Sequence, residues 1–419
     1  MGGETPALGD GAPYRQLLQG LTVLEMSAYQ SGTVGGALLA QLGARVIKIE
    51  QPGIGDPARG TTHISGAESK LDSGRNVLFE TANTDKKSVA IDLGTAEGRD
   101  IAHQLVLASD AFLTNYREAV LERVGLSYTQ LERIKPDLVY VRASASGLVV
   151  ERDDRSFDWI GQALSGLMWA CGRRDDTEPS VIVGGPVDQL GGTLAAFAVV
   201  LGLFGRERFG LGQRADVSLL GAGIHLQTLR VNQETLAHRP VQRHGRDQSR
   251  QPLANWYQCQ DGKWLMLCEL QSDRFWNDFC TVLGRTDLLE DSRFASQTSR
   301  RTSYRELIAV LDQVFASRNR DEWLEMFRRQ LPEFVLAPIL ELSDVVARAE
   351  VRANGYVTEF SHQNYGKTTI AGCPIAFSAT PARIARGAPE LGEHTEEVLG
   401  EVLGLSWDEI GQLREAGAI

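Results

Sequence analysis

The sequence predicts an α/β protein: a Rossmann-like, doubly wound parallel sheet with a second, smaller α+β domain. The first observation is a rhythm in residues 21–143, where short apolar runs rich in β-branched residues alternate with stretches of helical spacing. The second is a change of pattern near residue 235, where a polar, arginine-rich stretch precedes a hairpin signal and amphipathic helices. The expected organisation is a flexible extension at 1–20, a large domain at 21–230, a small domain at 235–345 and a returning segment at 350–419.

The large domain begins with a strand, a helix that ends at Gly43 and a second strand, which together form a βαβ unit. The same alternation then repeats along the chain. Strands that alternate with helices favour a parallel sheet with helices on both faces. The expected elements are strands at 21–27, 44–50, 88–93, 110–114 and 137–143, and helices at 35–42 and 95–109.

The second half of the chain is richer in helix. Around Asp261-Gly262 the alternation of residues 256–270 predicts a hairpin. The polar stretch before it, 237–250, is interpreted as a linker or surface loop. Other expected elements are helices at 160–168, 190–205, 273–283 and 304–315, a strand running into a helix at 213–220, strands within 350–385 and helix from 393.

Composition excludes several classes of protein. The 419 residues carry a net charge of −11 and no basic run, which argues against sequence-independent nucleic-acid binding. The five cysteines form no CxxC pair, so no zinc site or redox dithiol is indicated, and no metal is expected. The N-terminus lacks a signal-peptide pattern, and no apolar run reaches about 18 residues. A cytoplasmic protein without a membrane partner is therefore expected.

The common catalytic patterns are absent from the sequence. There is no GxSxG, HExxH or GxxxxGK[ST], and no GxGxxG follows the first strand, which weighs against a nicotinamide or flavin dehydrogenase. The turn at 29–33 instead places Gln30 and Ser31 at the carboxyl edge of the expected sheet, where open α/β sheets bind ligands. A polar turn with a helix cap is an equally good interpretation of this pattern.

A second candidate is the glycine- and proline-rich segment 184–192, which leads into a long apolar helix and contains Asp188. Base rates favour an aspartate that simply caps this helix. The flanking glycines would, however, let a substrate approach the carboxylate closely. From the residues alone both interpretations stay open.

Taken together, segments spread along the chain resemble the family III CoA-transferases, the superfamily of formyl-CoA transferase, carnitine CoA-transferase and bile-acid-inducible protein F. The resemblance covers about residues 18–230 and 350–400. The segments that carry it are 18–26, 43–52 with 55–56 and Arg59, Asn83 with 86–88, 91–93, 115–117, 138–140, 162–166, the Asp188 loop, 212–213 with 216–219, and 391–394.

The resemblance implies that Asp188 is a nucleophile that forms an aspartyl anhydride and then an aspartyl-CoA thioester, so that CoA moves between two carboxylic acids. It also implies that Gln30 donates to the oxyanion, that coenzyme A or acyl-CoA binds as a substrate with no tightly bound cofactor, and that the protein is an intertwined homodimer. Arg117 and Arg123 are the expected phosphate partners. The matched CoA contacts are Gln30, Ser31, Gln51, Ile91, Asp92, Leu93, Asn115, Tyr116, Arg117, Arg123, Arg155, Phe157 and Asp158.

Two departures from the family pattern bear on the reaction. The racemase branch has a His-Asp pair where this chain has Phe157-Asp158, so proton transfer at the α-carbon loses its base. The formyl-CoA branch has a run of glycines that 244–256 lacks, which leaves the acid substrates open. The alternatives are an acyl-CoA racemase or isomerase with Asp188 as general base, and a non-catalytic CoA-binding protein in which Asp188 caps a helix.

Overall fold

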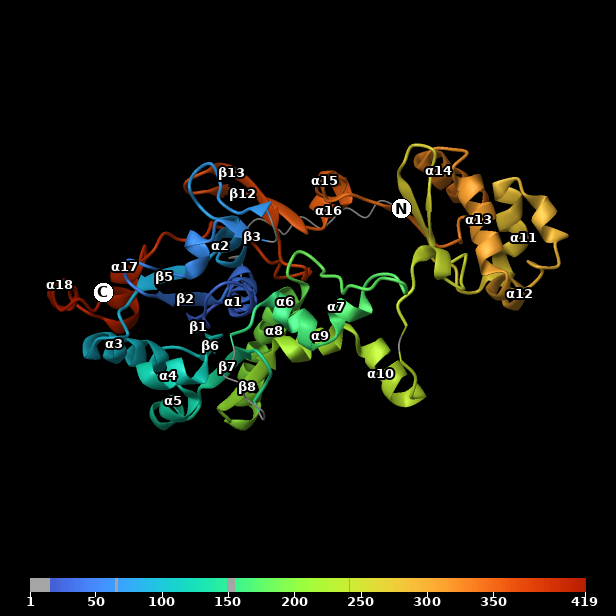
Figure 1. The fold of residues 1–419 in the computed structure, drawn as a ribbon. Helices are drawn as coiled ribbons and strands as arrows, with labels where there is room; N and C mark the ends of the chain where they lie inside the picture. The colour runs from blue at the N-terminus through green and yellow to red at the C-terminus, as the bar shows by residue number, and fades with distance from the viewer. Residues whose placement is uncertain (1–15, 65–66, 149–154, 241) are drawn as a thin grey trace. The chain divides into compact units, whose positions relative to one another are not determined.

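The computed structural model describes residues 16–64, 67–148, 155–240 and 242–419 (Figure 1). The chain divides into two compact units. Unit 1 combines the chain up to Met168 with Val181–Ala237 and Ala349–Ile419, and unit 2 combines Trp169–Ser180 with His238–Arg348. The sequence did not anticipate that Trp169–Ser180 would join the second unit. The expected N-terminal extension lies, up to residue 15, outside the described residues.

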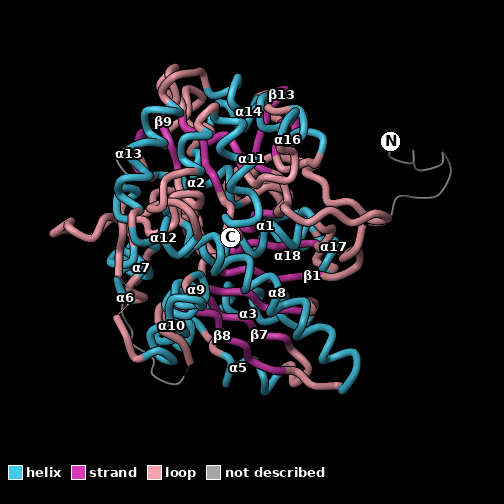
Figure 2. The backbone as a smooth tube through the Cα atoms, turned by 90° about the vertical axis from the view of Figure 1, so that its right-hand side faces the viewer, coloured by secondary structure: helices cyan, strands magenta, loops and turns pink. Residues whose placement is uncertain are grey.

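Unit 1 is built on a six-stranded sheet in the order β5-β2-β1-β6-β7-β8, in which every neighbouring pair is parallel. Figure 2 shows its strands between helices. The expected doubly wound parallel sheet is confirmed. The order reverses between β1 and β6, which makes their carboxyl ends the switch point of the sheet. The strands are β1 (Thr22–Met26), β2 (Arg45–Glu50), β5 (Lys87–Ala90), β6 (Ala111–Thr114), β7 (Val139–Ser144) and β8 (Gln213–Ser218).

Both faces of the sheet are covered, because successive strand residues point to opposite sides. Val23 packs in one buried cluster with Leu39 of α1 and Ala195 of α8, whereas Leu24 packs in another with Ile101 of α3. The covering helices are α1 (Ser31–Gln41) and α8 (Pro186–Phe209) on one face, and α3 (Ala96–Leu107), α4 (Glu118–Val124), α5 (Tyr128–Ile134), α17 (Thr395–Leu403) and α18 (Trp407–Glu415) on the other.

Smaller elements surround this sheet in unit 1. A hairpin of β12 and β13 forms part of the alternating region expected at 350–385. The helix expected at 160–168 ends instead at Leu164, because Gly166 takes a left-handed φ of +77° and breaks it. These elements are β3 (His63–Ile64), β4 (Ala67–Glu68), α2 (Val77–Ala82), α6 (Asp158–Leu164), α7 (Leu167–Ala170, across the unit boundary), α9 (Leu219–Leu226), α10 (Thr228–Ala237), α16 (Ala349–Ala353), β12 (Val357–His362) and β13 (Gly366–Ala371).

Helices α1 and α8 pack backbone to backbone. A Cβ on Gly35 would lie 2.8 Å from the carbonyl oxygen of Gly192, and one on Gly192 would lie 2.7 Å from the Cβ of Val34. Such distances leave room for hydrogen only, so glycine is required at the crossing. The close approach brings the start of α8 beside the start of α1.

The C-terminal segment closes the edge of the sheet at β5. The backbone N–H of His394 donates to the carbonyl of Ser88 at 3.0 Å, and the N–H of Ala90 donates to the hydroxyl of Thr395 at 3.0 Å. Farther along, the N–H of Asp92 donates to the carbonyl of Ala418 at 2.8 Å. Residues about 300 positions later in the chain therefore form hydrogen bonds with the backbone of this outer strand.

Unit 2 contains a three-stranded antiparallel sheet in the order β11-β10-β9 and several helices. The hairpin expected around Asp261-Gly262 is confirmed by the pairing of β9 with β10. Trp276, Phe279 and Trp323 are buried in its core. The elements are β9 (Trp256–Gln258), β10 (Trp264–Leu267), β11 (Leu336–Ile339), α11 (Ser272–Leu283), α12 (Gln297–Thr302), α13 (Tyr304–Phe315), α14 (Arg320–Gln330) and α15 (Leu342–Ala347).

Among the described residues, α8 alone is long and apolar enough to cross a membrane by length and composition, with a mean hydropathy of 1.7. The expectation from the sequence concerned an uninterrupted apolar run, whereas this helix reaches its length with polar positions such as Asp188 within it. The property is weak evidence for a membrane span, since core helices share it. In this structure α8 packs against α1 and β7.

Candidate active site

A cavity of about 390 Å³ lies at the carboxyl edge of the sheet in unit 1. Its walls come from the segments that follow β1, β6 and β7 and from the first turn of α8. Because β1 and β6 flank the switch point, their following turns diverge and leave this space. The structure brings together here eight of the residues expected from the sequence: Gln30, Ser31, Asn115, Tyr116, Arg117, Arg155, Phe157 and Asp188.

Six expected residues do not line the cavity. Ile91 and Leu93 are core residues, 0% and 7% exposed, and the carboxylate of Asp92 accepts from the N–H of Gly94 at 2.8 Å. Gln51 is exposed after β2, and Arg123 is exposed in the last turn of α4. The sixth, Asp158, is buried at the start of α6.

Asp158 holds the loop that carries Asp188. Its Oδ1 accepts from the backbone N–H of Val187 at 2.7 Å and of Asp188 at 3.0 Å, so it caps the N-terminus of α8 from another segment. Its Oδ2 accepts from the Gln162 side chain at 2.5 Å. The Asp158 carboxylate was expected to contact CoA, but it instead accepts hydrogen bonds from the backbone of the loop that carries Asp188.

Asp188 lies in the first turn of α8, after Gly184 and Gly185, whose φ values of +94° and +68° are left-handed. This backbone turns sharply into the helix and leaves the carboxylate at the cavity wall. Burial, together with the negative charge of Asp158, raises the pKa of Asp188 to about 7. A carboxyl group with such a pKa in a cavity is typical of a functional site.

Gln30 precedes α1 and lies beside the start of α8. Its Nε2 donates to the carbonyl of Leu78 at 3.0 Å, and its Oε1 accepts from the side chain of Gln189, the residue after Asp188, at 3.3 Å. The preceding residue, Tyr29, stacks edge-on against Phe157 with ring centroids 5.3 Å apart. The turn after β1 and the Asp188 loop therefore share one wall of the cavity.

Sequence reasoning missed the contribution of β7. Arg142, near the end of this strand, lines the cavity while only 1% exposed, and it forms ion pairs with Glu118 at 2.7 Å and with Asp216 at 3.2 Å. Residues 143–147 continue the same wall. The signal was available, because residues 137–143 were an expected strand and all strands of a parallel sheet end at the same edge.

Metal ligands do not gather in the part of the chain that the structure describes. No group of three or more His, Cys, Asp or Glu side chains lies there in a position to hold an ion. The polar groups of the cavity are a carboxyl, two carboxamides, hydroxyls and arginines. Such groups can attack a carbonyl, donate to an oxyanion and bind phosphate, in each case without a metal ligand set.

Fold and cavity define a doubly wound α/β protein with a candidate ligand site at the switch point of its sheet, lined by a carboxyl group of high pKa and by arginine side chains. The family model for CoA-transferase family III matches residues 18–395, and the chain belongs to this family. The resemblance expected from the sequence is confirmed. The protein is accordingly an enzyme of the CoA-transferase type, with CoA thioesters and carboxylic acids as its classes of substrate.

Similar proteins cover nearly the whole chain. A formyl-CoA:oxalate CoA-transferase of Rhodopseudomonas palustris is 26% identical over 96% of this chain and 97% of its own length. A succinyl-CoA:glutarate CoA-transferase of Mus musculus is 28% identical over 96% and 90%, respectively. Among solved structures, a CAIB/BAIF family protein from Brucella suis has a TM-score of 0.80 at 26% identity and covers 92% of this chain and 99% of its own.

Proposed function

We propose that this enzyme transfers CoA from an acyl-CoA thioester to a second carboxylic acid through covalent intermediates on Asp188. The observation that carries the proposal is the position of Asp188: it lies in the wall of the cavity, with a carboxyl pKa of about 7. Near neutral pH about half of such groups are ionised, and the ionised form is poorly hydrated. A carboxylate in this state is more basic and more nucleophilic than one in water.

The proposed reaction begins when an Asp188 carboxylate oxygen attacks the thioester carbonyl carbon. The C–S bond breaks, CoA thiolate leaves, and an acyl-aspartyl anhydride remains. The thiolate then attacks the aspartyl carbonyl, the anhydride C–O bond breaks, and the first acid leaves as its carboxylate. The second acid reverses both steps, so the energy of the thioester is retained in the new acyl-CoA.

Each step passes through an oxyanion that needs donors. Gln30 supplies a side-chain amide in the wall of the cavity, and Ser31 begins α1, where backbone N–H groups have no partner within the helix. The amide of Gln30 is bonded to Leu78 in this structure. We therefore expect this amide to exchange the Leu78 carbonyl for the oxyanion when acyl-CoA is bound.

CoA is proposed to lie along the carboxyl edge of the sheet. Arg117 and Arg155 line the cavity and are suited to its phosphate groups through charge-assisted hydrogen bonds. Gln51 follows β2 and residues 91–93 follow β5, so these matched positions lie at the same edge although outside the cavity. An extended ligand that reaches from the cavity towards β5 would pass them.

A second copy of the chain is part of the proposal. Phe197, Leu201 and Phe204 recur on one face of α8 and are 58%, 49% and 54% exposed, and Leu229 and Leu236 of α10 are 82% and 80% exposed. Exposed apolar side chains of this size on two helices support an interface. We propose a homodimer, intertwined as the family resemblance implies. Sedimentation at micromolar concentration is expected to give twice the chain mass of 45.9 kDa, and a monomer would contradict it.

The deciding experiment is intact-protein mass spectrometry after incubation with formyl-CoA, succinyl-CoA and 2-hydroxyacyl-CoA, the donors that the names of similar enzymes suggest. At least one donor is expected to add CoA to Asp188, with loss of the adduct on hydroxylamine treatment and in Asp188→Asn. Asp85→Asn is a matched control, because Asp85 is a half-buried aspartate that precedes β5, at the opposite edge of the sheet.

Absence of an adduct with every donor, while CoA still binds, would refute the covalent mechanism. Exchange of the substrate α-proton with deuterium from solvent, without an acceptor acid, would then support the racemase or isomerase alternative. Phe157 provides no base for that reaction. Bound CoA without an adduct or exchange would leave Asp188 with the helix-capping role alone.

A further inference from the structure

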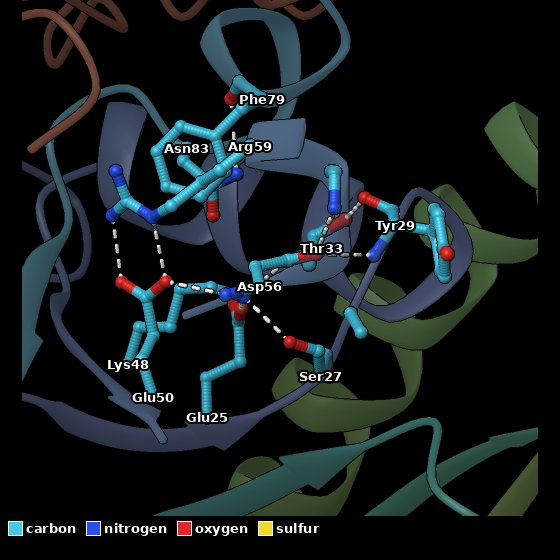
Figure 3. A network of polar contacts seen from close by, with 12 residues as sticks. Glu25, Ser27, Tyr29, Thr33, Lys48, Glu50, Asp56, Arg59, Phe79 and Asn83 are labelled. Atoms are coloured by element: carbon cyan, nitrogen blue, oxygen red, sulfur yellow. Dashed lines mark hydrogen bonds and ion pairs between the residues drawn. The ribbon is translucent and has the colours of Figure 1, made fainter. Parts of the chain in front are cut away.

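Charged side chains are buried beneath the turn that carries Gln30 (Figure 3). The ammonium group of Lys48 lies 3.1 Å from Glu25 and 3.0 Å from Asp56, and all three side chains are 0% exposed. Lys86, also 0% exposed, lies 2.7 Å from the other oxygen of Glu25. Burial opposes the charge of Lys48, but the carboxylates of Asp56 and Glu25 raise its pKa overall. Two cations and two anions balance in this cluster.

Burying four charges costs free energy that apolar residues of the same volume would not require. The contacts of the cluster indicate what the charges do instead. Asp56 Oδ1 accepts from the backbone N–H of Tyr29 at 3.1 Å and of Ala58 at 2.9 Å. Lys48 also donates to the carbonyl of Ser27 at 2.6 Å. Asp56 and Lys48 therefore bind the backbone on both sides of Ala28.

The residue between these two attachment points is held as well. Asn115 Oδ1 accepts from the N–H of Ala28 at 2.9 Å, and its Nδ2 donates to the Ala28 carbonyl at 2.6 Å. Three consecutive residues after β1 are thus fixed by side chains from β2, from the loop after β2 and from the end of β6. Asp56 itself is fixed, because its N–H donates to Glu50 at 2.8 Å.

This turn needs to be held because Tyr29 has a φ of +60°, a left-handed conformation that a residue with a side chain rarely adopts. Such a conformation persists where the surroundings over-determine it. It sets the direction of the chain into α1, and so the place of the Gln30 carboxamide and of the first N–H groups of the helix. The hydroxyl of Thr33, in α1, also donates to the carbonyl of Gln30 at 2.8 Å.

We infer that Asp56 and Lys48 are positioning residues for CoA transfer: they hold Tyr29 left-handed and thereby fix the oxyanion donors of the Gln30 turn relative to Asp188. Neither residue lines the cavity in the part of the chain described. The inference rests on the proposed function, since it assigns a role within the same site. It adds a function for the segment 55–59, which the sequence marked only as part of the family likeness.

The test compares Asp56→Ala, which removes the acceptor for Tyr29, with Asp56→Asn, which keeps an acceptor oxygen but not the charge facing Lys48. Asp56→Ala is expected to slow formation of the Asp188–CoA adduct at saturating donor roughly ten- to a hundred-fold, the usual effect of misplaced catalytic groups. The dissociation constant for CoA is expected to stay within about two-fold. Asp56→Asn is expected to recover part of the rate.

Asp85→Asn is the matched control, because Asp85 also accepts from two backbone N–H groups, those of Ala385 and Arg386, but does not line the cavity. It is expected to leave both the adduct rate and the CoA affinity unchanged. A folded Asp56→Ala that reacts at the wild-type rate overturns the inference. If Asp56→Ala does not fold, an Asp56→Asn variant that reacts as fast as Asp85→Asn overturns it equally.

A readout without turnover separates this inference from the proposed function. In the wild type the N–H of Tyr29 is bonded to Asp56 and should exchange slowly with solvent deuterium, whereas Asp56→Ala should lose this protection and Asp85→Asn should keep it. If the wild type forms no adduct but this pattern is found, the covalent mechanism fails while the positioning contact stands. Unchanged exchange at Tyr29 in Asp56→Ala contradicts the positioning role.

Discussion

Asparagine in place of Asp188 keeps the shape of the side chain but removes its titration, and the structure predicts what that does to stability. Burial beside Asp158 raises the carboxyl pKa from 3.8 to about 7 in the folded protein. At about 1.36 kcal/mol for each pH unit, this difference costs the folded state about 4 kcal/mol when the group is ionised. Asp188→Asn should therefore be more stable than the wild type at alkaline pH.

The sign and the pH window follow from proton linkage. The unfolded chain releases this proton near pH 4 and the folded chain near pH 7, so the wild type loses stability as the pH rises through this interval. Below about pH 4 both states are protonated and the cost vanishes. The free energy of unfolding of Asp188→Asn is expected to exceed that of the wild type by about 2 kcal/mol at pH 5.5 and by about 4 kcal/mol at pH 8.5.

Urea unfolding followed by circular dichroism at the two pH values measures this advantage. Asp100→Asn is the control, because Asp100 is exposed on α3 and does not line the cavity. The control should change stability little and equally at both pH values. The reasoning would be refuted if the free energy of unfolding of Asp188→Asn differed from that of the wild type by the same amount at pH 5.5 and pH 8.5. A raised carboxyl pKa in the folded state makes this difference depend on pH.

Three further outcomes are expected. Asp158→Asn removes the negative charge beside Asp188 and should move the midpoint of the pH–rate profile for adduct formation down by about one pH unit; an unmoved midpoint would contradict this coupling. Gly192→Ala should destabilise by roughly 1–3 kcal/mol in urea unfolding, because its Cβ would meet Val34, whereas Gly411→Ala, in open space on α18, should be neutral or stabilising. Arg117→Gln should raise the dissociation constant for CoA about ten-fold in calorimetry, and an unchanged constant would exclude a phosphate contact.

The parallel sheet could be predicted because its signal is local. Several strands contain short apolar runs, such as β1 and β6, and α1 ends just before Gly43, a recognisable stop. The order of the strands could not be predicted, since it depends on which runs pair across long separations. The grouping of Trp169–Ser180 with unit 2 escaped notice for the same reason.

The candidate site shows the same division between local and distant information. The pattern could place Gln30 at the carboxyl edge of the sheet, because Gln30 follows a strand end, whereas Asp188 was assigned through the family resemblance, since its local pattern fits a helix cap. The contact of Asp158 with the N–H of Asp188 could not be inferred, because the two residues are 30 positions apart and belong to different helices. The family resemblance assigned Ile91 and Leu93 as contacts of CoA, yet their side chains are buried in the core.

The closure of β5 by the C-terminal segment bears on how the protein is made. Residues 238–348 belong to unit 2, and only afterwards does the chain supply His394 and Thr395 to the outer strand. At roughly 5–20 residues per second, a ribosome needs about 6–20 s to synthesise that insertion. During this interval the nascent first domain presents an open strand edge, a template for pairing with other chains. Emergence of residues 394–395 from the ribosome, rather than synthesis of the six strands themselves, is then the event that covers this edge.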